Sequence, residues 1–386
     1  MVTICPACIE AGHPGAVLQR RRERTVGFLK SNVNIIREAT KSGWVVDPQE
    51  PVLVTGAGGF VGSRVVATLL RMGFKDVRCV VRAAGDLGLL HQAGAAYPPG
   101  HWKLMEANLL SREDCARVAE GVVLAYHLVA GRGKSFPGCF QGSVVATRNV
   151  LDALLAHGQL RRFVNVSSFA VYSNWRLPCG AVWDESCPIE DHLEERYDAY
   201  AYGKVKQDEL VLDYHRKHGV PFVTVRPGIV FGPGKKAIPG FVGMDTFGFF
   251  AHLGGGSPLP LTYVDNCAEA IVLAGLVHGV EGEVFNVVDD DLPTSSQFLR
   301  QYKRRVRAFR SVRVPYWLAY RLCGLWEWYA ARSNGQLPPV FNRRMCAFAW
   351  KGHRYSNQKL KERLGWRCRV PMPEALSRYF EYQKNG

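Results

Sequence analysis

The stretch from Val52 to Val66, VLVTGAGGFVGSRVV, joins an apolar run to a helical pattern through a glycine-rich turn. Val61, Val65 and Leu69 recur at the spacing of one helix face. The glycines of the turn are Gly56, Gly59 and Gly62. Glycines between a strand and a helix let the backbone approach a pyrophosphate, which the helix N-terminus also attracts. The stretch therefore predicts a dinucleotide site at the first strand of an α/β fold.

Apolar strand-like runs and helical patterns continue to alternate over residues 51–228. The strand-like runs are PVLVT, VRCVV, HWKLMEA, VVLAYHLV, FVNVSS and PFVTVRP. Such alternation is typical of a parallel sheet wrapped by helices on both faces. It predicts a Rossmann-type doubly wound α/β domain over residues 51–228, to which later segments contribute. Residues 1–50 are expected to form an N-terminal arm, and residues 229–386 a smaller substrate-binding lobe with C-terminal helices.

The composition is that of an ordinary globular protein, with 47% hydrophobic residues among 386. No run of about eighteen apolar residues and no signal-peptide pattern occurs, which predicts a cytoplasmic protein. The eleven cysteines lack the spacing of a disulfide framework, so reduced thiols are expected. Cys5 and Cys8 have only half of a zinc-like spacing, so no metal site is predicted and the role of this pair stays open.

The end of the second strand bears on the choice of cofactor. About twenty residues beyond the last glycine, a dinucleotide site usually has an acid that binds the adenosine ribose. Arg82 stands there instead. An arginine can pair with a 2′-phosphate, so NADP is favoured over NAD, with Arg64 as a second candidate contact. Asp86 in the following loop keeps NAD open as the alternative.

Six motifs occur in order along the chain from about Pro51: TGAGGFVG, YHLVA, NVSSFAVY, YAYGK, VRPGIVFGPG and TYVDNCAEAIVLA. In order and approximate spacing they resemble the extended short-chain dehydrogenases/reductases, the NAD-dependent epimerase/dehydratase family. The C-terminal segments RVPYWLAYRL and RYSNQKLKERLGW are similar to bacterial 3β-hydroxysteroid dehydrogenase-like members and to nucleotide-sugar epimerases. The resemblance implies an NAD(P)-dependent enzyme with a small-molecule substrate, and a homodimer, as many relatives are.

The segment YDAYAYGKVK contains the pattern Tyr-x-x-x-Lys twice, at Tyr200/Lys204 and at Tyr202/Lys206. Residues four apart lie on one helix face, so either pair can place an ammonium beside a phenol. In the family a small residue precedes the catalytic lysine and an acid follows four residues after it. Only the first pair meets both conditions, through Gly203 and Asp208. Tyr202 and Lys206 are therefore assigned to other faces of the helix.

The resemblance assigns a catalytic triad to three residues. Tyr200 is expected to act as the acid/base, with Lys204 as its partner. The family's serine stands four residues before the tyrosine of the VY motif, which indicates Ser168 rather than Ser167. Its hydroxyl is expected to hydrogen-bond the substrate oxygen while hydride moves between nicotinamide and substrate.

The resemblance also implies cofactor contacts from the ends of several strands. They are Gly56, Gly59, Phe60, Val61, Gly62, Arg82, Asn108, Leu109, His127, Ala130, Tyr200, Lys204 and Pro227. The side chain of His127 itself is interpreted as packed in the core. Asn108 stands where the family often has an aspartate, and Ser143 replaces the usual asparagine of the following helix.

Three classes of function compete for this chain. Nucleotide-sugar dehydratases and decarboxylases carry carboxylates directly after the catalytic serine or threonine, whereas this chain has Phe169 and Ala170, which excludes both reactions. A non-catalytic cofactor sensor typically lacks the Tyr/Lys pair. An oxidoreductase acting on a sterol-like, lipid-linked or sugar alcohol is the preferred interpretation, and a nucleotide-sugar 4-epimerase with tightly bound NAD is the alternative.

The formal charge of +15 is concentrated in places, and the dense basic runs are residues 19–24 and 303–313. A basic run over residues 303–313 precedes apolar positions of a helical pattern: Trp317, Leu318, Leu322, Leu325, Trp326 and Tyr329. Residues 303–331 therefore predict peripheral contact with an anionic membrane at its inner face. A helix that caps the substrate pocket would show the same pattern and stays open as the alternative. No module for nucleic-acid binding accompanies the charge.

Overall fold

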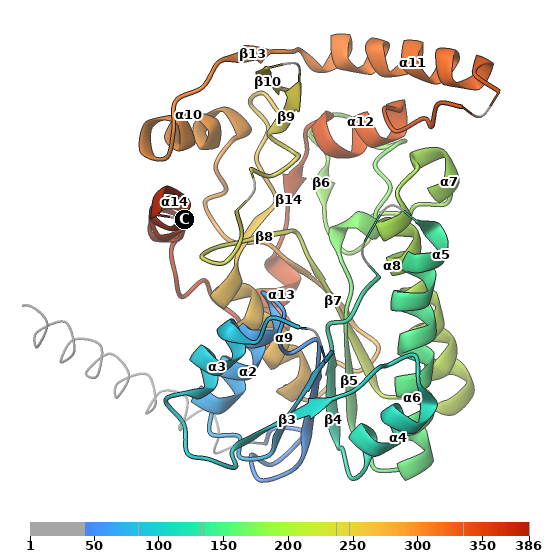
Figure 1. Cartoon of the computed structure of the whole chain (residues 1–386), viewed down its shortest axis with the longest axis vertical. Coiled ribbons are helices and arrows are strands. Elements are labelled where there is room, and N and C mark those ends of the chain that lie inside the picture. Colours follow the sequence, from blue (N-terminus) through green and yellow to red (C-terminus); the bar gives the residue numbers. More distant parts are fainter. Residues whose placement is uncertain are drawn as a thin grey trace, which may run out of the picture. The chain divides into compact units, whose positions relative to one another are not determined.

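A seven-stranded parallel sheet forms the centre of the molecule (Figure 1). The computed structural model describes residues 43–83, 85–131, 133, 135–236, 238–246, 248–334 and 336–385. In spatial order the strands are β12 (Val284–Val287), β7 (Phe222–Pro227), β5 (Arg162–Val166), β4 (Leu124–His127), β1 (Val52–Thr55), β2 (Val77–Val81) and β3 (Trp102–Glu106). The chain winds outward in both directions from β1, so the predicted doubly wound fold is confirmed.

Helices cover both faces of this sheet (Figure 1). One face carries α2 (Gly62–Arg71), α3 (Gly88–Gly94) and α9 (Val264–Leu276). The other carries α4 (Arg112–Ala119), α6 (Ala146–His157) and α8 (Ala199–His218), with α5 (Phe136–Phe140) and a π-helical turn (Gln141–Val145) leading into α6. Buried aliphatic side chains fill the layer between these helices and the strands. Strand β12 and helix α9 come from beyond residue 228, so the later half of the chain completes the sheet layer.

Most of the remaining elements form a lobe at the carboxyl ends of the strands. In this lobe β8 (Ile229–Phe231) pairs with β11 (Leu261–Tyr263), and β6 (Val182–Trp183) pairs with β14 (Arg354–Tyr355). A third sheet has β10 (Phe249–His252) in the middle, between β9 (Gly243–Thr246) and β13 (Ser311–Arg313). Its helices are α7 (Leu193–Arg196), α10 (Ser295–Arg305), α11 (Tyr316–Arg332), α12 (Arg343–Trp350) and α14 (Met372–Asn385). Helix α13 (Gln358–Leu364) instead packs against β12 and α9 of the sheet layer. Aromatic side chains of β8, α10 and α14 meet in the core of the lobe, because their rings offer large apolar surfaces.

Helix α11 lies at the upper end of Figure 1, against α12. Its outward side, here called the α11 outer face, consists of Trp317, Leu322, Leu325, Trp328 and Tyr329, all exposed. Of the six apolar positions named from the sequence, Leu318 and Trp326 are only partly exposed, and Trp328 is exposed in addition to the other four. The indole of Trp326 instead donates to the carbonyl of Pro338 at 3.2 Å and packs against Phe341, because the chain folds back after the helix.

Two further expectations concern membranes and thiols. In the described part of the chain, no helix combines the length and the hydropathy that crossing a membrane requires. The nine cysteines within that part are all free thiols, as expected. Residues 1–42, with Cys5, Cys8 and most of the expected N-terminal arm, lie outside the described residues.

Candidate active site

The sheet itself determines where a ligand binds. Strands β1 and β4 are neighbours, and the chain leaves them in opposite directions, towards β2 on one side and β5 on the other. In an open parallel sheet, a crevice forms outside the carboxyl ends of the strands at such a point. The segments after β1, β2, β4, β5 and β7 all begin at this edge, and they contain most of the residues predicted for the site.

The turn after β1 has the form that a pyrophosphate requires. Gly56 adopts φ = 71°, which a side chain would strain, and a Cβ atom on Gly62 would overlap the carbonyl oxygen of Gly56. Helix α2 then starts without a side-chain cap at Val61 and without an acid in its first turn. Its N-terminal N–H groups and its dipole can therefore serve an anion. The residues of this turn fit the phosphates of a dinucleotide.

The groups near the adenosine end are exposed. Arg82 follows β2 with an exposed side chain, while the carboxylate of Asp86 accepts a hydrogen bond from the N–H of Gly88 at 2.9 Å. Arg64 lies 3.6 Å from Asp265 on α9, so its charge is directed there. Asn108 is also exposed, and its side-chain oxygen accepts from the N–H of Leu110. Of the two arginines, Arg64 has a carboxylate partner, whereas the guanidinium of Arg82 has no carboxylate within 4.0 Å among the described residues.

Helix α8 brings Lys204, of the first Tyr/Lys pair, to the end of β5. Asp198 caps the helix by accepting from the N–H of Ala201, which places Tyr200 in the first turn and Lys204 one turn later. The buried ammonium of Lys204 donates to the carbonyl of Val166, the last residue of β5, at 2.6 Å. Since Ser168 follows Val166 by two residues, the lysine lies beside the start of the serine segment.

The second Tyr/Lys pair points elsewhere, as the sequence predicted. The ring of Tyr202 packs against Phe136 and Phe140 on α5, and Lys206 pairs with Glu209 at 2.8 Å on the surface. Gly203 explains why a small residue precedes Lys204. A Cβ atom there would lie 2.9 Å from the carbonyl oxygen of Cys139, and no side chain fits between the two helices.

The two serines after β5 have different surroundings. Ser167 is buried and donates to the carboxylate of Asp208 at 2.9 Å. Asp208 also accepts from Asn165 at 2.7 Å and from Arg226 at 3.1 Å. Ser168 is only partly buried, and its hydroxyl oxygen accepts from the N–H of Ala170 at 3.1 Å, which leaves the O–H able to donate. The environment of Ser168 is thus the one compatible with a hydrogen bond to substrate.

His127 is a core residue, as the sequence interpretation had it. Its ring nitrogens contact the hydroxyls of Thr55 and Thr147, each at 2.9 Å. The hydroxyl of Thr147 donates to the carbonyl of Ser143, so His127 must donate to Thr147 through Nε2–H and accept from Thr55 at Nδ1. Burial, and secondarily the charge of Lys204, lowers the pKa of His127 to about 3. The imidazole is therefore neutral and cannot serve as an acid at neutral pH.

This low pKa makes stability depend on pH. An unfolded histidine titrates near ~6.5, so below that pH the unfolded chain binds a proton that folded His127 does not. The stability due to this residue is complete above about pH 6.5 and is lost as the pH falls towards 3, by about 1.4 kcal/mol per pH unit. We expect His127→Gln to reduce the slope of unfolding free energy between pH 6 and pH 5 by that amount in urea titrations. Equal slopes for both proteins would contradict this protonation state.

Two residues that support the site were not predicted from the sequence. Arg196, fully buried, donates to the carbonyls of Ala170 and Tyr172 and to the carboxylate of Asp198 at 2.9 Å. It thereby joins the serine segment to the cap of α8. Gln207 accepts from Lys204 at 2.9 Å and donates to Thr147 at 2.8 Å. Its position three residues after Lys204, on the same helix face, was the available signal.

The other predicted cofactor contacts divide into two groups. Phe60, Val61, Ala130 and Pro227 lie in or next to the segments at the carboxyl edge, and Phe60 contacts Gly234 of the lobe. Leu109 has a buried side chain, and its carbonyl accepts from Asn149 of α6 at 3.1 Å. The side chain of Leu109 is thus part of the core.

Comparison with known proteins identifies the family of this chain. A model of the NAD-dependent epimerase/dehydratase family matches residues 52–287. The chain belongs to the NAD-dependent epimerase/dehydratase family. The resemblance drawn from the motifs is therefore confirmed, and the protein is an enzyme of the extended short-chain dehydrogenase/reductase type.

Curated relatives of this family member carry out several reactions. It is 25% identical over 365 residues to 3beta-hydroxysteroid-dehydrogenase/decarboxylase isoform 1 of Arabidopsis thaliana, covering 86% of this chain and 80% of that protein. It is 27% identical over 252 residues to a trifunctional UDP-glucose 4,6-dehydratase/UDP-4-keto-6-deoxy-D-glucose 3,5-epimerase/UDP-4-keto-L-rhamnose-reductase of the same plant. That match covers 61% of this chain but only 36% of the trifunctional protein's length.

Solved structures share the fold. The dTDP-glucose 4,6-dehydratase DesIV of Streptomyces venezuelae, with NAD and TYD bound, has a TM-score of 0.65 at 21% identity and covers 87% of this chain and 97% of its own. The UDP-glucuronic acid 4-epimerase of Bacillus cereus, in complex with NAD, has a TM-score of 0.63 at 19% identity. The match covers 87% of this chain and 99% of the epimerase chain. At these identities the likeness establishes the fold of the family member and not its substrate.

Proposed function

We propose that the enzyme is an NAD(P)-dependent oxidoreductase that interconverts a secondary alcohol and a ketone, with Tyr200 as acid/base. The observation that carries the proposal is the hydrogen bond from Lys204 to the last residue of β5, one helical turn after Tyr200 and two residues before Ser168. Lys206, the lysine of the second pair, instead pairs with Glu209 on the surface. A tyrosine can transfer the proton beside a hydride donor when a neighbouring ammonium stabilises its phenolate.

Each residue has a separate task in this mechanism. When bound, NAD(P) supplies the hydride or accepts it. Ser168 donates a hydrogen bond to the substrate oxygen, and Tyr200 gives that oxygen a proton in reduction or removes it in oxidation. A phenol has an ordinary pKa near ~10, so the ammonium of Lys204 is needed to stabilise the phenolate. Lys204 would also hold the ribose hydroxyls of a bound cofactor, and Gln207 orients the ammonium of Lys204 by accepting a hydrogen bond from it.

We propose a hydrophobic substrate, sterol-like or lipid-linked. The match to the 3beta-hydroxysteroid-dehydrogenase/decarboxylase extends over 86% of the chain and so includes the lobe, which favours this class over sugars. The second candidate is a nucleotide-sugar 4-epimerase, favoured by the NAD-bound epimerase of the same fold. Purified enzyme should oxidise NADPH in the presence of a hydrophobic ketone such as a 3-ketosteroid. Activity with UDP-sugars but with no ketone would favour the epimerase.

The cofactor preference follows from Arg82. NADP is proposed over NAD because the exposed guanidinium has no carboxylate partner among the described residues and can pair with a 2′-phosphate. Arg82→Asp should weaken NADPH binding by about 1–3 kcal/mol, the scale of a lost charge-assisted contact, and should spare NADH. Fluorescence titration with both cofactors measures this. Arg367→Asp, an equal charge change at an exposed position, is the control.

We also propose that residues 303–331 make peripheral contact with the inner face of a membrane. A homodimer is proposed separately, because many members of the family are dimers. Seven arginines from the end of α10 to the end of α11 are exposed: Arg304, Arg305, Arg307, Arg310, Arg313, Arg321 and Arg332. None of them has a carboxylate among the described residues within 4.0 Å. Each contributes about 1 kcal/mol near an anionic surface, and the exposed tryptophans and leucines add apolar burial.

Flotation with liposomes tests this contact. Salt-sensitive binding to anionic vesicles and weak binding to neutral ones is expected. Leu325→Asp should abolish most of the binding, because it puts a carboxylate into the centre of the α11 outer face, where Leu325 is 64% exposed. Leu212→Asp, at an exposed leucine of α8, should leave it intact. Absence of binding to both vesicle types would remove the membrane from the proposal.

A further inference from the structure

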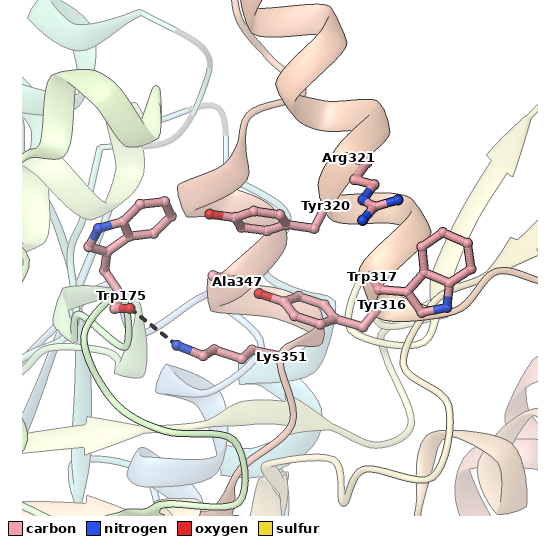
Figure 2. A pocket seen from close by; sticks show the side chains of 7 residues that line it. All are labelled: Trp175, Tyr316, Trp317, Tyr320, Arg321, Ala347 and Lys351. Atoms are coloured by element: carbon pink, nitrogen blue, oxygen red, sulfur yellow. Dashed lines mark hydrogen bonds between the residues drawn. The ribbon is translucent and has the colours of Figure 1, made fainter.

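A cavity of about 340 Å³ lies behind helix α11, between it, α12 and the segment that follows Ser168 (Figure 2). Its lining includes Trp175, Tyr316, Trp317, Tyr320, Arg321 and Lys351. The volume falls in the range of small-ligand pockets. The catalytic mechanism proposed above uses none of these residues, so the cavity needs an explanation of its own.

The walls of the cavity are aromatic. The indole of Trp175 and the ring of Tyr320 have their centroids 6.2 Å apart and are inclined by 28°, and Tyr316 follows Tyr320 at 5.8 Å. Figure 2 shows both tyrosine rings extending from α11 towards the side of Trp175, above the ammonium of Lys351. Flat rings of this kind offer apolar area with little rotational freedom. They suit an aliphatic or ring-shaped apolar body.

The polar groups of the cavity are positive. Lys351 donates to the carbonyls of Asn174 and Trp175 at 3.3 and 3.1 Å, which leaves the third N–H of its ammonium for another acceptor. Arg321 lies over the ring of Trp317 at 5.5 Å. No carboxylate stands among the lining residues that the structure describes. The cavity therefore favours an anionic group beside the apolar body.

The mouth of the cavity is shared with the surface that we assign to the membrane. Trp317 lines the cavity and belongs to the α11 outer face, with 58% of its surface exposed. Arg321 likewise lines the cavity and is exposed on the same helix. A molecule held at an anionic lipid surface by its head group would thus meet the entrance directly.

We propose that this cavity binds a single-chain anionic lipid, with its apolar body against Trp175 and Tyr320 and its carboxylate or phosphate at Lys351. The source of the ligand rests on the proposed membrane contact, whereas the binding itself does not. Trp175 lies seven residues after Ser168 in one continuous segment. The bound lipid therefore contacts the segment that carries the proposed catalytic serine.

Decyl phosphate below its critical micelle concentration serves as the probe in isothermal titration calorimetry, without membranes and without turnover. Saturable binding of one equivalent is expected. Lys351→Gln should weaken it at least tenfold while leaving the binding of uncharged decanol unchanged. Trp328→Ser, on the outer face but outside the cavity lining, is the matched control and should leave the affinity for decyl phosphate as it is.

Melting curves and a cofactor titration check that the variants are folded. If Lys351→Gln proves unstable, Lys351→Met keeps the apolar stem of the side chain while removing its charge, and it should weaken the binding of the probe at least tenfold. Absence of saturable binding to the wild-type enzyme would overturn the proposal. Equal weakening by Lys351→Gln and Trp328→Ser would also overturn it, since it would show adsorption to the helix surface. Neither result depends on the outcome of the liposome or ketone experiments.

Discussion

Replacing Tyr200 by phenylalanine should lower turnover by about 10²–10⁴-fold, the contribution of a positioned proton donor. The substitution removes one oxygen from a side chain in the first turn of α8 and leaves Lys204 bonded to Val166. Cofactor affinity should therefore stay within a few-fold of the wild-type value. Steady-state rates on the best ketone substrate, together with an NADPH titration, measure both effects.

The neighbouring tyrosine provides the matched control. Tyr202 contacts Phe136 and Phe140 through its ring, which phenylalanine retains. Tyr202→Phe should accordingly leave the rate nearly unchanged. An inactive Tyr202→Phe enzyme beside an active Tyr200→Phe enzyme would mean that the wrong Tyr/Lys pair has been assigned.

Replacing Asp208 by alanine should lower the free energy of unfolding by about 3–5 kcal/mol, because it leaves a buried charge without its partner. The guanidinium of Arg226 is 9% exposed and lies 3.1 Å from this carboxylate. Burial opposes the charge of Arg226, but the carboxylate of Asp208 and the nearby Tyr172 together raise its pKa. Asn165 and Ser167 lose an acceptor in the same substitution. Urea denaturation followed by fluorescence measures the loss.

The neighbouring acid, Glu209, is a control that removes a carboxylate from an exposed position instead of a buried one. Glu209 is exposed and pairs with Lys206 on the surface, so Glu209→Ala should cost only about 0–1 kcal/mol. Adding Arg226→Met to Asp208→Ala should recover part of the loss, since no unpaired charge then remains. If Asp208→Ala lowers the free energy of unfolding no more than Glu209→Ala does, the buried Asp208–Arg226 pair does not stabilise the end of β7.

The central sheet could be predicted because most of its strands can be recognised from their own short sequences. All six runs became strands. Five of them are buried, and a strand covered on both faces has a nearly continuous apolar sequence, whereas the edge strand β3 is largely exposed. Strand β12 was not among them. It is a four-residue segment that joins the sheet beside β7 from about sixty positions further along the chain, and its sequence alone gives no sign of that partner.

The site was predictable only where chemistry and spacing coincide. Glycines at a turn and a lysine four residues after a tyrosine follow from short-range geometry. Arg196 does not, because its partners are carbonyls of the serine segment about 25 residues earlier, and any sequence can supply a carbonyl. Trp326 and Trp328 could not be distinguished by spacing, since the segment that covers Trp326 comes after the helix.

The cofactor content of the purified enzyme tests the central claim most directly, because it requires no knowledge of the substrate. An oxidoreductase must exchange its cofactor in every turnover, whereas an epimerase returns the hydride and keeps its NAD. We expect less than one equivalent of nucleotide after gel filtration, and reversible, saturable binding of added NADPH in a fluorescence titration. One full equivalent of NAD, released only when the protein is denatured, would contradict the oxidoreductase and favour the 4-epimerase.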